Sequence, residues 1–230
     1  MACTAYSHLN VESSRIFIAL YTAFLIHLDD MVEPEISHLY SFNKYFVHKE
    51  PHGTRILEAF ALLLRETTDH FDDICSNIIV TATLNLVTAR LLEENPNRIQ
   101  LPVDSLYPLF SRTMSGAAEA YALFAFHSNV PWTDYIHAIP DIANFINDGN
   151  DVLSFYKENL AGDEQNRISM ISKCKGVSKI DALTELASEG TMADGRVLRY
   201  LKTQPDALRA YQEFRVGYIH FHLSLPRYKL

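Results

Sequence analysis

The chain has 230 residues, of which 48% are hydrophobic and 21% charged, an ordinary balance for a single globular domain. Its formal charge of −8 argues against a nucleic-acid-binding protein, because phosphate backbones require clustered Lys and Arg. The cysteines lie far apart in no metal-ligand spacing, and no apolar run reaches the roughly 18 residues of a membrane span. Because the N-terminus also lacks the pattern of a signal peptide, we expect a soluble cytoplasmic protein with free thiols and no stable membrane anchor.

Residues 11–30 are predicted to form the first long helix. Its apolar residues leave hardly any polar face, which favours a central position in a helical bundle; they are Ile16, Ala19, Leu20, Ala23, Phe24, Ile26 and Leu28. The helix runs into Asp29, Asp30 and Glu33, and Pro34 ends it. Three anions at a helix C-terminus oppose the helix dipole. A solvated helix end is the alternative, but the very apolar run before it favours a metal-binding site.

The next stretch contains more ordinary helices. Residues 37–47 are expected to form a short aromatic helix, and residues 54–71 a helix with apolar residues at helical spacing. Asp72 and Asp73 have no third carboxylate at a suitable offset, so we interpret them as a loop or a helix cap. Residues 77–94 are predicted to form another helix, closed by residues 95–97.

Residues 106–126 are predicted to be helical with a break among the small residues of 112–118. Within a continuous helix, Gly116 would cost about 1 kcal/mol relative to Ala. A break here would direct backbone carbonyls and the Arg112 side chain toward a ligand. A kink that serves packing is the alternative.

A long helix is predicted to start at Pro131, and it carries the most informative pattern. Asn150, Ser154 and Glu158 lie at i, i+4 and i+8, so they share one face of that helix. An amide oxygen, a hydroxyl and a carboxylate are hard oxygen ligands of the kind that Mg²⁺ takes. Lys157 beside them could meet a phosphate as a point charge. For the spacing alone, the polar face of an amphipathic helix is the alternative.

The remaining segments are a polar loop at residues 162–176 and a capped helix at residues 178–193, with Leu183 and Leu186 facing inward. Pro205 is predicted to open the last long helix.

The end of the chain offers two candidate sites. His220 and His222 invite a metal-site interpretation, but residues two apart face different directions on a helix, so we expect no histidine metal site. Arg227 and Tyr228 place a fork of donors beside a phenol, a combination that suits a phosphate.

Together these motifs resemble those of class I terpene cyclases. Asp29, Asp30 and Glu33 look like the aspartate-rich motif of that family, and the string from Asn150 to Glu158 matches its second Mg²⁺ motif at every defining position. The run Asn-Asp-x-x-Ser-Phe-Tyr-Lys-Glu, followed by a Gly-Asp-Glu-x-Asn loop, is particularly similar to fungal sesquiterpene cyclases of the trichodiene and longiborneol synthase type. The resemblance extends from about residue 6 to the end of the sequence.

The same resemblance assigns further positions. Arg112 stands where these cyclases carry a diphosphate-sensing arginine, and Ser115 and Gly116 where their linker and helix-break residues lie. Arg227 and Tyr228 look like their C-terminal Arg-Tyr pair.

The resemblance implies an all-α class I terpenoid synthase bundle around a central active-site cavity, with residues 1–230 as one domain. It implies Mg²⁺, three ions, and an isoprenoid diphosphate substrate, with ionisation and cyclisation of farnesyl diphosphate to a sesquiterpene and release of diphosphate. The implied metal ligands are Asp29, Asp30, Glu33, Asn150, Ser154 and Glu158, the implied diphosphate donors are Arg112, Lys157, Arg227 and Tyr228, and the implied pocket residues are Tyr21, Phe24, Ser115, Gly116 and Phe145. The catalytic set within them is Asp29, Arg112, Asn150, Ser154 and Glu158. Packing in the core is the alternative role for the three aromatic residues.

Family members normally carry several tens of residues, including helices, ahead of the segment that begins here. We therefore expect a domain that lacks the usual N-terminal helices, with pocket closure as the feature most affected. The alternatives are a truncated, non-catalytic or altered-function homologue, and a prenyl transferase, for which a second aspartate-rich motif would be expected at residues 150–158. The sequence leaves open whether the chain is a monomer or forms a homodimer that covers exposed apolar surface.

Overall fold

The computed structural model describes residues 1–94, 100–126 and 128–229, and in these residues it contains helices and turns but no strand. The all-α fold predicted from the sequence is confirmed. The α-helices are α1 (Glu12–Asp30), α2 (Phe42–His48), α3 (Arg55–Arg65), α4 (Asp73–Glu93), α5 (Tyr107–Ser115), α6 (Ala118–Leu123), α7 (Ile139–Leu160), α8 (Arg167–Lys175), α9 (Lys179–Tyr200) and α10 (Pro205–Ser224). Short 3₁₀ turns lie at Glu35–Ser41, Glu66–Asp69, Trp132–Asp134, Ile136–Ala138, Leu201–Thr203 and Pro226–Tyr228.

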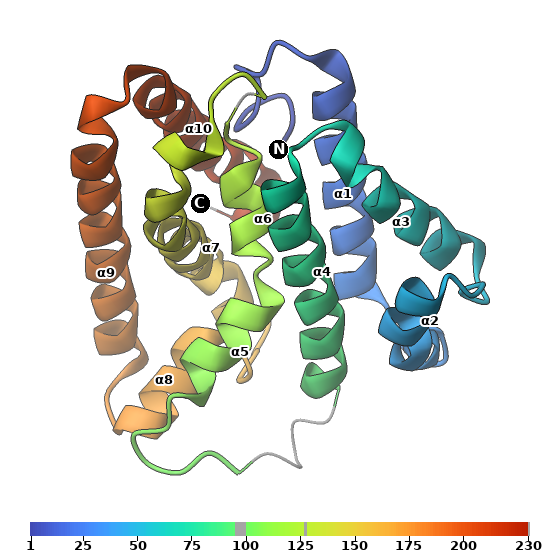
Figure 1. The fold of residues 1–230 in the computed structure, drawn as a ribbon. Coiled ribbons are helices and arrows are strands. Elements are labelled where there is room, and N and C mark those ends of the chain that lie inside the picture. The colour runs from blue at the N-terminus through green and yellow to red at the C-terminus, as the bar shows by residue number, and fades with distance from the viewer. Residues whose placement is uncertain (95–99, 127, 230) are drawn as a thin grey trace.

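The helices form a bundle in which α7 lies between α9 and α6 (Figure 1). On the other side of α6, α4 packs against both α5 and α6, and α1 and α3 complete that side of the molecule. α5 and α8 contact each other below α7 in the view of Figure 1. The C-terminal half of α7, which carries the predicted ligand face, therefore runs toward α5 and α8.

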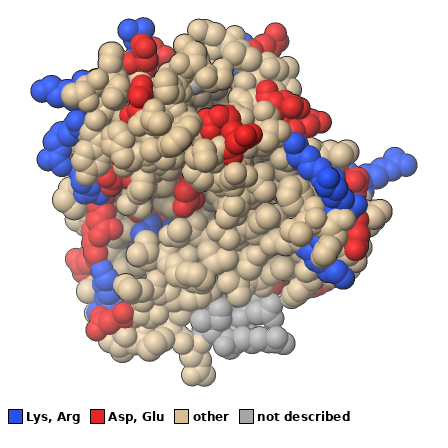
Figure 2. Space-filling model, viewed as in Figure 1, with Lys and Arg blue, Asp and Glu red and all other residues tan. Residues whose placement is uncertain are grey.

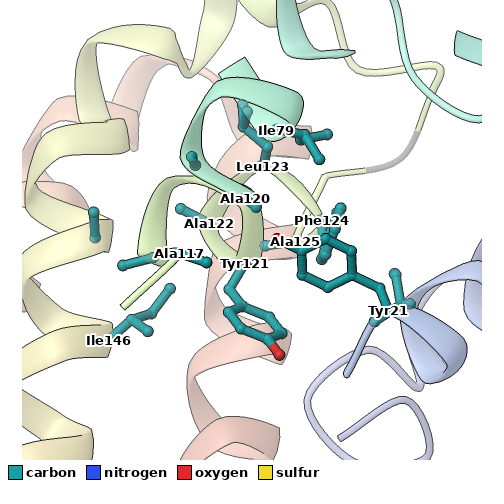
Figure 3. Packing of buried hydrophobic residues seen from close by; sticks show 14 of the residues in the cluster. Tyr21, Ile79, Ala117, Ala120, Tyr121, Ala122, Leu123, Phe124, Ala125 and Ile146 are labelled. Atoms are coloured by element: carbon teal, nitrogen blue, oxygen red, sulfur yellow. The ribbon is translucent and has the colours of Figure 1, made fainter. Parts of the chain in front are cut away.

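The interior of the bundle is built largely from aromatic rings. Tyr6, Phe17, Tyr21, Phe124 and Phe214 are each at most 2% exposed. The Phe124 ring meets that of Tyr21 edge to face, with ring centroids 5.1 Å apart (Figure 3). It meets the Phe17 ring in the same way, with centroids 6.0 Å apart. α6 contributes fully buried alanines, which let its backbone pack closely between α4 and α7.

Side-chain caps set several helix starts, and the sequence predicts those at Asp72 and Ser178. Thr54 accepts a hydrogen bond from the Leu57 backbone N–H at 3.2 Å and begins α3, and Asp72 caps α4 in the same way. Ser178 and Asp181 form a capping box at the start of α9. The predicted helix end at residues 95–97 lies outside the described residues.

The expected central position of α1 is wrong. Ile16, Leu20 and Ile26 are 53%, 47% and 40% exposed, while Tyr21 and Leu28 on the opposite side are buried. α1 therefore lies at the edge of the bundle, and its apolar composition supplies an apolar outer surface rather than a second buried face. Composition alone does not distinguish these two cases.

Two other expectations need correction. The expected polar loop at residues 162–176 contains α8, which Asn166 starts by accepting from the Ser169 N–H at 2.9 Å and which Gly176 ends at φ +65°. The long helix predicted from Pro131 begins only at Ile139, after two 3₁₀ turns, because Pro140 is accommodated in its first turn.

Among the described residues, one helix, α4, is long and apolar enough to cross a membrane by length and composition, with a mean hydropathy of 1.4. A core helix of a bundle passes the same test, and α4 buries residues such as Ile79 and Val87 against its neighbours. On the face shown in Figure 2, uncharged atoms cover most of the surface and Lys and Arg gather toward its margins.

Candidate active site

The predicted ligand face of α7 lines an open cavity of about 810 Å³. Asn150, Ser154 and Glu158 all lie in its wall, with Asp151 and Lys157 beside them. The wall facing them comes from α1, α4, α5, α8 and the C-terminal turn. The i, i+4, i+8 spacing therefore places three oxygen-bearing side chains in the wall of one cavity.

The cavity wall opposite α7 carries two acidic side chains. Asp29 ends α1, and Glu93 ends α4. Desolvation raises the pKa of Glu93, and the Asp29 carboxylate adds to that rise. Arg90 binds the carbonyl end of α1, donating to the backbone oxygens of Leu28 at 3.1 Å and Met31 at 2.8 Å. A protein side chain thus offsets part of the unfavourable charge at this helix end.

Asp30 and Glu33 do not line this cavity, and both are exposed. Adjacent residues on an α-helix point about 100° apart, so Asp29 and Asp30 face different directions. Glu33 lies beyond Asp30, the last residue of α1, so it does not share a helix face with Asp29 despite the spacing of four residues. Within the described ranges, no three His, Cys, Asp or Glu side chains form a metal-binding cluster. A metal at this site would therefore depend on the amide and hydroxyl oxygens of α7.

Arg112 bridges α5 to the ligand face of α7. Its Nη2 donates to Asn150 Oδ1 at 2.9 Å, and its Nε lies 3.0 Å from Asp151 Oδ1 in an ion pair. The Arg112 guanidinium also lines the cavity, and about a fifth of the Arg112 side chain is exposed. The break after α5 allows this placement, because Ala117 takes a left-handed conformation with φ +44°.

Arg167 on α8 is a cavity residue that the sequence analysis missed. Its Nη1 lies 2.6 Å from Asp148 Oδ1 and 3.0 Å from Asp151 Oδ2. Burial raises the pKa of Asp148 to about 6, although the Arg167 guanidinium acts in the opposite direction. Asp151 is thus held between two guanidinium groups, which fixes α5 and α8 against α7. This contact was not predicted because residues 162–176 were expected to form a loop, and a loop gives no helical face on which to place Arg167.

Three further donors converge at the C-terminal turn. Lys157 Nζ lies 5.8 Å from the centre of the Tyr228 ring and 3.8 Å from Glu158 Oε1. Arg227 also lies over the Tyr228 ring, with its Cζ 5.7 Å from the centre. Burial raises the pKa of Tyr228, so its phenol is a neutral hydrogen-bond donor. All of the diphosphate donors implied by the resemblance line the same cavity.

The α7 oxygens have properties that suit a hard cation. The Ser154 hydroxyl is buried and makes no hydrogen bond of standard geometry in the described part of the chain. It lies close enough to Glu158 to lower the pKa of that carboxyl, while desolvation acts more strongly and raises it. A carboxylate destabilised by desolvation gains from a cation beside it, and a buried hydroxyl that accepts no hydrogen bond has a lone pair to offer. The donor set therefore fits Mg²⁺.

The expected pocket residues divide into two groups. Ser115 lines the cavity, and Gly116 lies behind it against the Asn147 side chain. Tyr21, Phe24 and Phe145 do not line the cavity and pack in the core, which is the alternative role for aromatic residues at helical spacing. Tyr21 lies among core rings with its hydroxyl 2.8 Å from Thr83 Oγ1 (Figure 3). Phe24 lies 5.2 Å from the Phe60 ring, and Phe145 lies 5.7 Å from the Tyr218 ring.

The fold is that of class I terpene synthases. Over 96% of the chain, the structure matches the crystal structure of linalool/nerolidol synthase from Streptomyces clavuligerus with a TM-score of 0.76, covering 85% of that protein at 12% sequence identity. The same enzyme in complex with 2-fluorogeranyl diphosphate matches with a TM-score of 0.73 over 97% of the chain and 85% of that protein. At this level of identity the match concerns the fold.

Sequence relatives define the family more closely. The family model for trichodiene synthase (TRI5) matches residues 1–230. The chain is 36% identical over 228 residues to alpha-cuprenene synthase COP6 of Coprinopsis cinerea, covering 99% of this chain and 70% of that protein. It is 29% identical over 240 residues to longiborneol synthase CLM1 of Gibberella zeae, covering 99% of this chain and 69% of that protein. The chain therefore belongs to the trichodiene synthase family of terpene cyclases, as the motifs predict.

Proposed function

We propose that the chain ionises and cyclises farnesyl diphosphate to a sesquiterpene and releases diphosphate, with Mg²⁺ as its cofactor. One observation carries this proposal: a single cavity collects Asn150, Ser154 and Glu158 from α7 with Arg112 and Asp29 from facing helices. Membership of a terpene cyclase family supports the reaction class. We also propose that residues 1–230 act as one domain, because the main buried core takes residues from Ala5 to Tyr218, with a smaller cluster where α7, α8 and α9 meet.

The metal ligands in this proposal are Asn150, Ser154, Glu158 and Asp29. Three ions are expected from the family resemblance. Bound there, Mg²⁺ supplies positive charge that stabilises the departing diphosphate. Asp30 and Glu33 are left out of the ligand set because they face away from the cavity.

The remaining donors bind and orient the diphosphate. Arg112 can donate to phosphate oxygens through its planar fork while Asp151 holds it in place. Lys157, Arg227 and the Tyr228 hydroxyl approach the same region from α7 and the C-terminal turn. Fixed donors of this kind stabilise charge that develops on the leaving group as the carbon–oxygen bond breaks.

The hydrocarbon part of the substrate requires an apolar, water-poor wall, because water would quench an allylic cation. Leu92, Leu101, Tyr107 and Met170 supply apolar surface in the same cavity. A ligand pocket of this size is within the usual range of about 300–1,000 Å³. The structure with 2-fluorogeranyl diphosphate in the bacterial neighbour supports an isoprenoid diphosphate as the substrate class. Similarity to sesquiterpene cyclases favours the C15 chain length.

The test is incubation of the purified chain with farnesyl diphosphate and Mg²⁺, followed by gas chromatography–mass spectrometry. We expect a sesquiterpene hydrocarbon or alcohol that disappears when the metal is chelated. Parallel reactions with geranyl and geranylgeranyl diphosphate compare chain lengths, and a preference for either would overturn the C15 assignment. Formation of a longer diphosphate from added isopentenyl diphosphate would instead identify a prenyl transferase. No product, with pyrophosphate binding retained in calorimetry, would identify a non-catalytic homologue and overturn the proposed reaction.

A further inference from the structure

His222, on α10, is buried behind the cavity and contacts the ligand face of α7. It is 1% exposed. Its Nδ1 lies 2.9 Å from the backbone oxygen of Tyr218, and its Nε2 lies 3.4 Å from Asn150 Nδ2. His222 does not line the cavity and so has no direct access to a ligand there. It meets two residues that do line the cavity, Asn150 through the contact at Nε2 and Tyr228 through its ring.

The chemistry of its two partners determines which ring nitrogen carries the proton. The Tyr218 carbonyl oxygen can only accept, so His222 Nδ1 must carry the hydrogen and donate it. In the neutral ring, Nε2 then holds a lone pair and accepts. An amide NH₂ donates to such an acceptor, whereas an amide oxygen would be repelled by it. The amide nitrogen of Asn150 therefore belongs on the His222 side.

A second contact supports the same amide orientation independently. Arg112 Nη2 lies 2.9 Å from Asn150 Oδ1. A guanidinium has donors but no acceptor, so the atom that it meets must be the oxygen. His222 and Arg112 thus identify opposite ends of one side-chain amide, with the oxygen on the side of the cavity-lining guanidinium.

The imidazole is held rigidly enough to act as an orienting group. Its ring centroid lies 4.5 Å from that of Tyr218 and 4.7 Å from that of Tyr228. The Tyr218 hydroxyl donates to the Ile146 backbone oxygen at 2.7 Å, which anchors α10 to α7 one turn before Asn150. His222 thus connects the C-terminal turn, through Tyr228, to the ligand face of α7.

We propose that His222 is a positioning residue that holds the Asn150 amide with its oxygen toward the cavity, where it can bind a divalent cation. This inference rests on the proposed function, in which Asn150 Oδ1 is a metal ligand. Without an acceptor behind it, the amide can rotate by 180° and present its NH₂ group, which cannot bind a cation. Groups that orient a ligand in this way typically contribute about 10–100-fold to metal affinity.

Two substitutions at His222 separate positioning from packing. His222→Asn keeps an amide donor near the Tyr218 carbonyl but is too short to reach Asn150. His222→Gln reaches the position of Nε2 and can place a carbonyl oxygen there as acceptor. His220→Asn is the matched control, because His220 lies on the same helix with an exposed side chain.

The readout is calorimetric affinity for Mg²⁺ in the presence of inorganic pyrophosphate, with the melting temperature measured in parallel. We expect His222→Asn to bind Mg²⁺ about 10–100-fold more weakly, and His222→Gln to recover most of that loss at a similar melting temperature. His220→Asn should match the unmodified chain. The proposal would be overturned if both His222 variants bound Mg²⁺ as tightly as the unmodified chain. It would also be overturned if both lost the same affinity for Mg²⁺ in step with a fall in melting temperature.

A measurement that needs no metal separates this inference from the proposed function. The ¹⁵N chemical shifts of His222 should report a protonated Nδ1 and an unprotonated Nε2. A protonated Nε2 would overturn the positioning role whatever the activity of the protein. Conversely, if the expected ring form is present but the unmodified chain binds no Mg²⁺ with pyrophosphate, the proposed function fails and the positioning role in metal binding fails with it.

Discussion

Arg112 Nη2 donates to Asn150 Oδ1 at 2.9 Å, so the amide oxygen that we propose as a metal ligand already contacts a cationic group. The same guanidinium forms an ion pair with Asp151 at 3.0 Å. A diphosphate entering the cavity would offer Arg112 a doubly hydrogen-bonded partner and thereby free the amide oxygen. Metal binding and diphosphate binding are then coupled through one side chain.

Removal of the Arg112 guanidinium should change the two affinities in opposite directions. In Arg112→Gln, we expect pyrophosphate to bind at least about 10-fold more weakly, since a charged fork is lost. Affinity for Mg²⁺ alone should rise a few-fold, because the Asn150 oxygen no longer contacts a cation. Isothermal titration calorimetry with each component checks both effects. Arg196→Gln, which removes an ion pair to Asp141 away from the cavity, serves as the control. Parallel losses in both affinities would contradict the coupling.

Glu158 should be required for chemistry more than for folding. Glu158→Gln keeps the shape of the side chain and removes the only carboxylate on the proposed α7 ligand face, so turnover should fall by about 10²–10³-fold. The melting temperature should change by no more than about 2 °C, because desolvation already disfavours the charged form of this carboxyl. Glu185→Gln is the matched control, as Glu185 is on α9 with an exposed ion pair to Lys175. Unchanged turnover in Glu158→Gln would contradict the assignment of Glu158 as a metal ligand.

The features predicted from the sequence are those that depend on local spacing. Asn150, Ser154 and Glu158 share a face because a helix repeats every 3.6 residues, whatever packs around it. Asp72 and Ser178 cap helices through bonds to N–H groups two or three residues away. Such interactions need no knowledge of the rest of the chain.

The features that were missed depend on contacts between distant segments. Arg90 reaches backbone oxygens of α1 some 60 residues earlier in the chain, and His222 meets Asn150 across 72 residues. Local sequence patterns do not predict such contacts between distant residues. The role of Tyr21 illustrates a related limit, since an aromatic residue on an apolar helix face suits a core and a ligand pocket equally well.

Gly116 should be required for the close approach of α5 and α7. Its backbone is helical, so Gly116→Ala gains helix propensity, but the added methyl group would clash with Asn147 Oδ1 and lie only 3.0 Å from Asn147 Cγ. Asn147 is buried and cannot easily move, so we expect a net loss of about 1–3 kcal/mol in the free energy of unfolding. Chemical denaturation checks this. Gly195→Ala on α9 meets no atom within 4 Å and should stabilise by up to about 1 kcal/mol. A stabilised Gly116→Ala would contradict the packing argument.

Tyr21 provides the final test, because its two possible roles predict different outcomes. The Thr83 hydroxyl donates to the Ile79 backbone oxygen at 2.7 Å, so the Tyr21 hydroxyl is the donor in its 2.8 Å bond to Thr83 Oγ1. Tyr21→Phe removes this buried hydrogen bond and should lower the free energy of unfolding by about 1 kcal/mol. As a core residue it should leave the distribution of terpene products unchanged in gas chromatography–mass spectrometry. Tyr156→Phe, at a position 53% exposed, controls for the loss of a hydroxyl. An altered product distribution in Tyr21→Phe alone would place Tyr21 against the substrate and show that the catalytic cavity extends into the aromatic core.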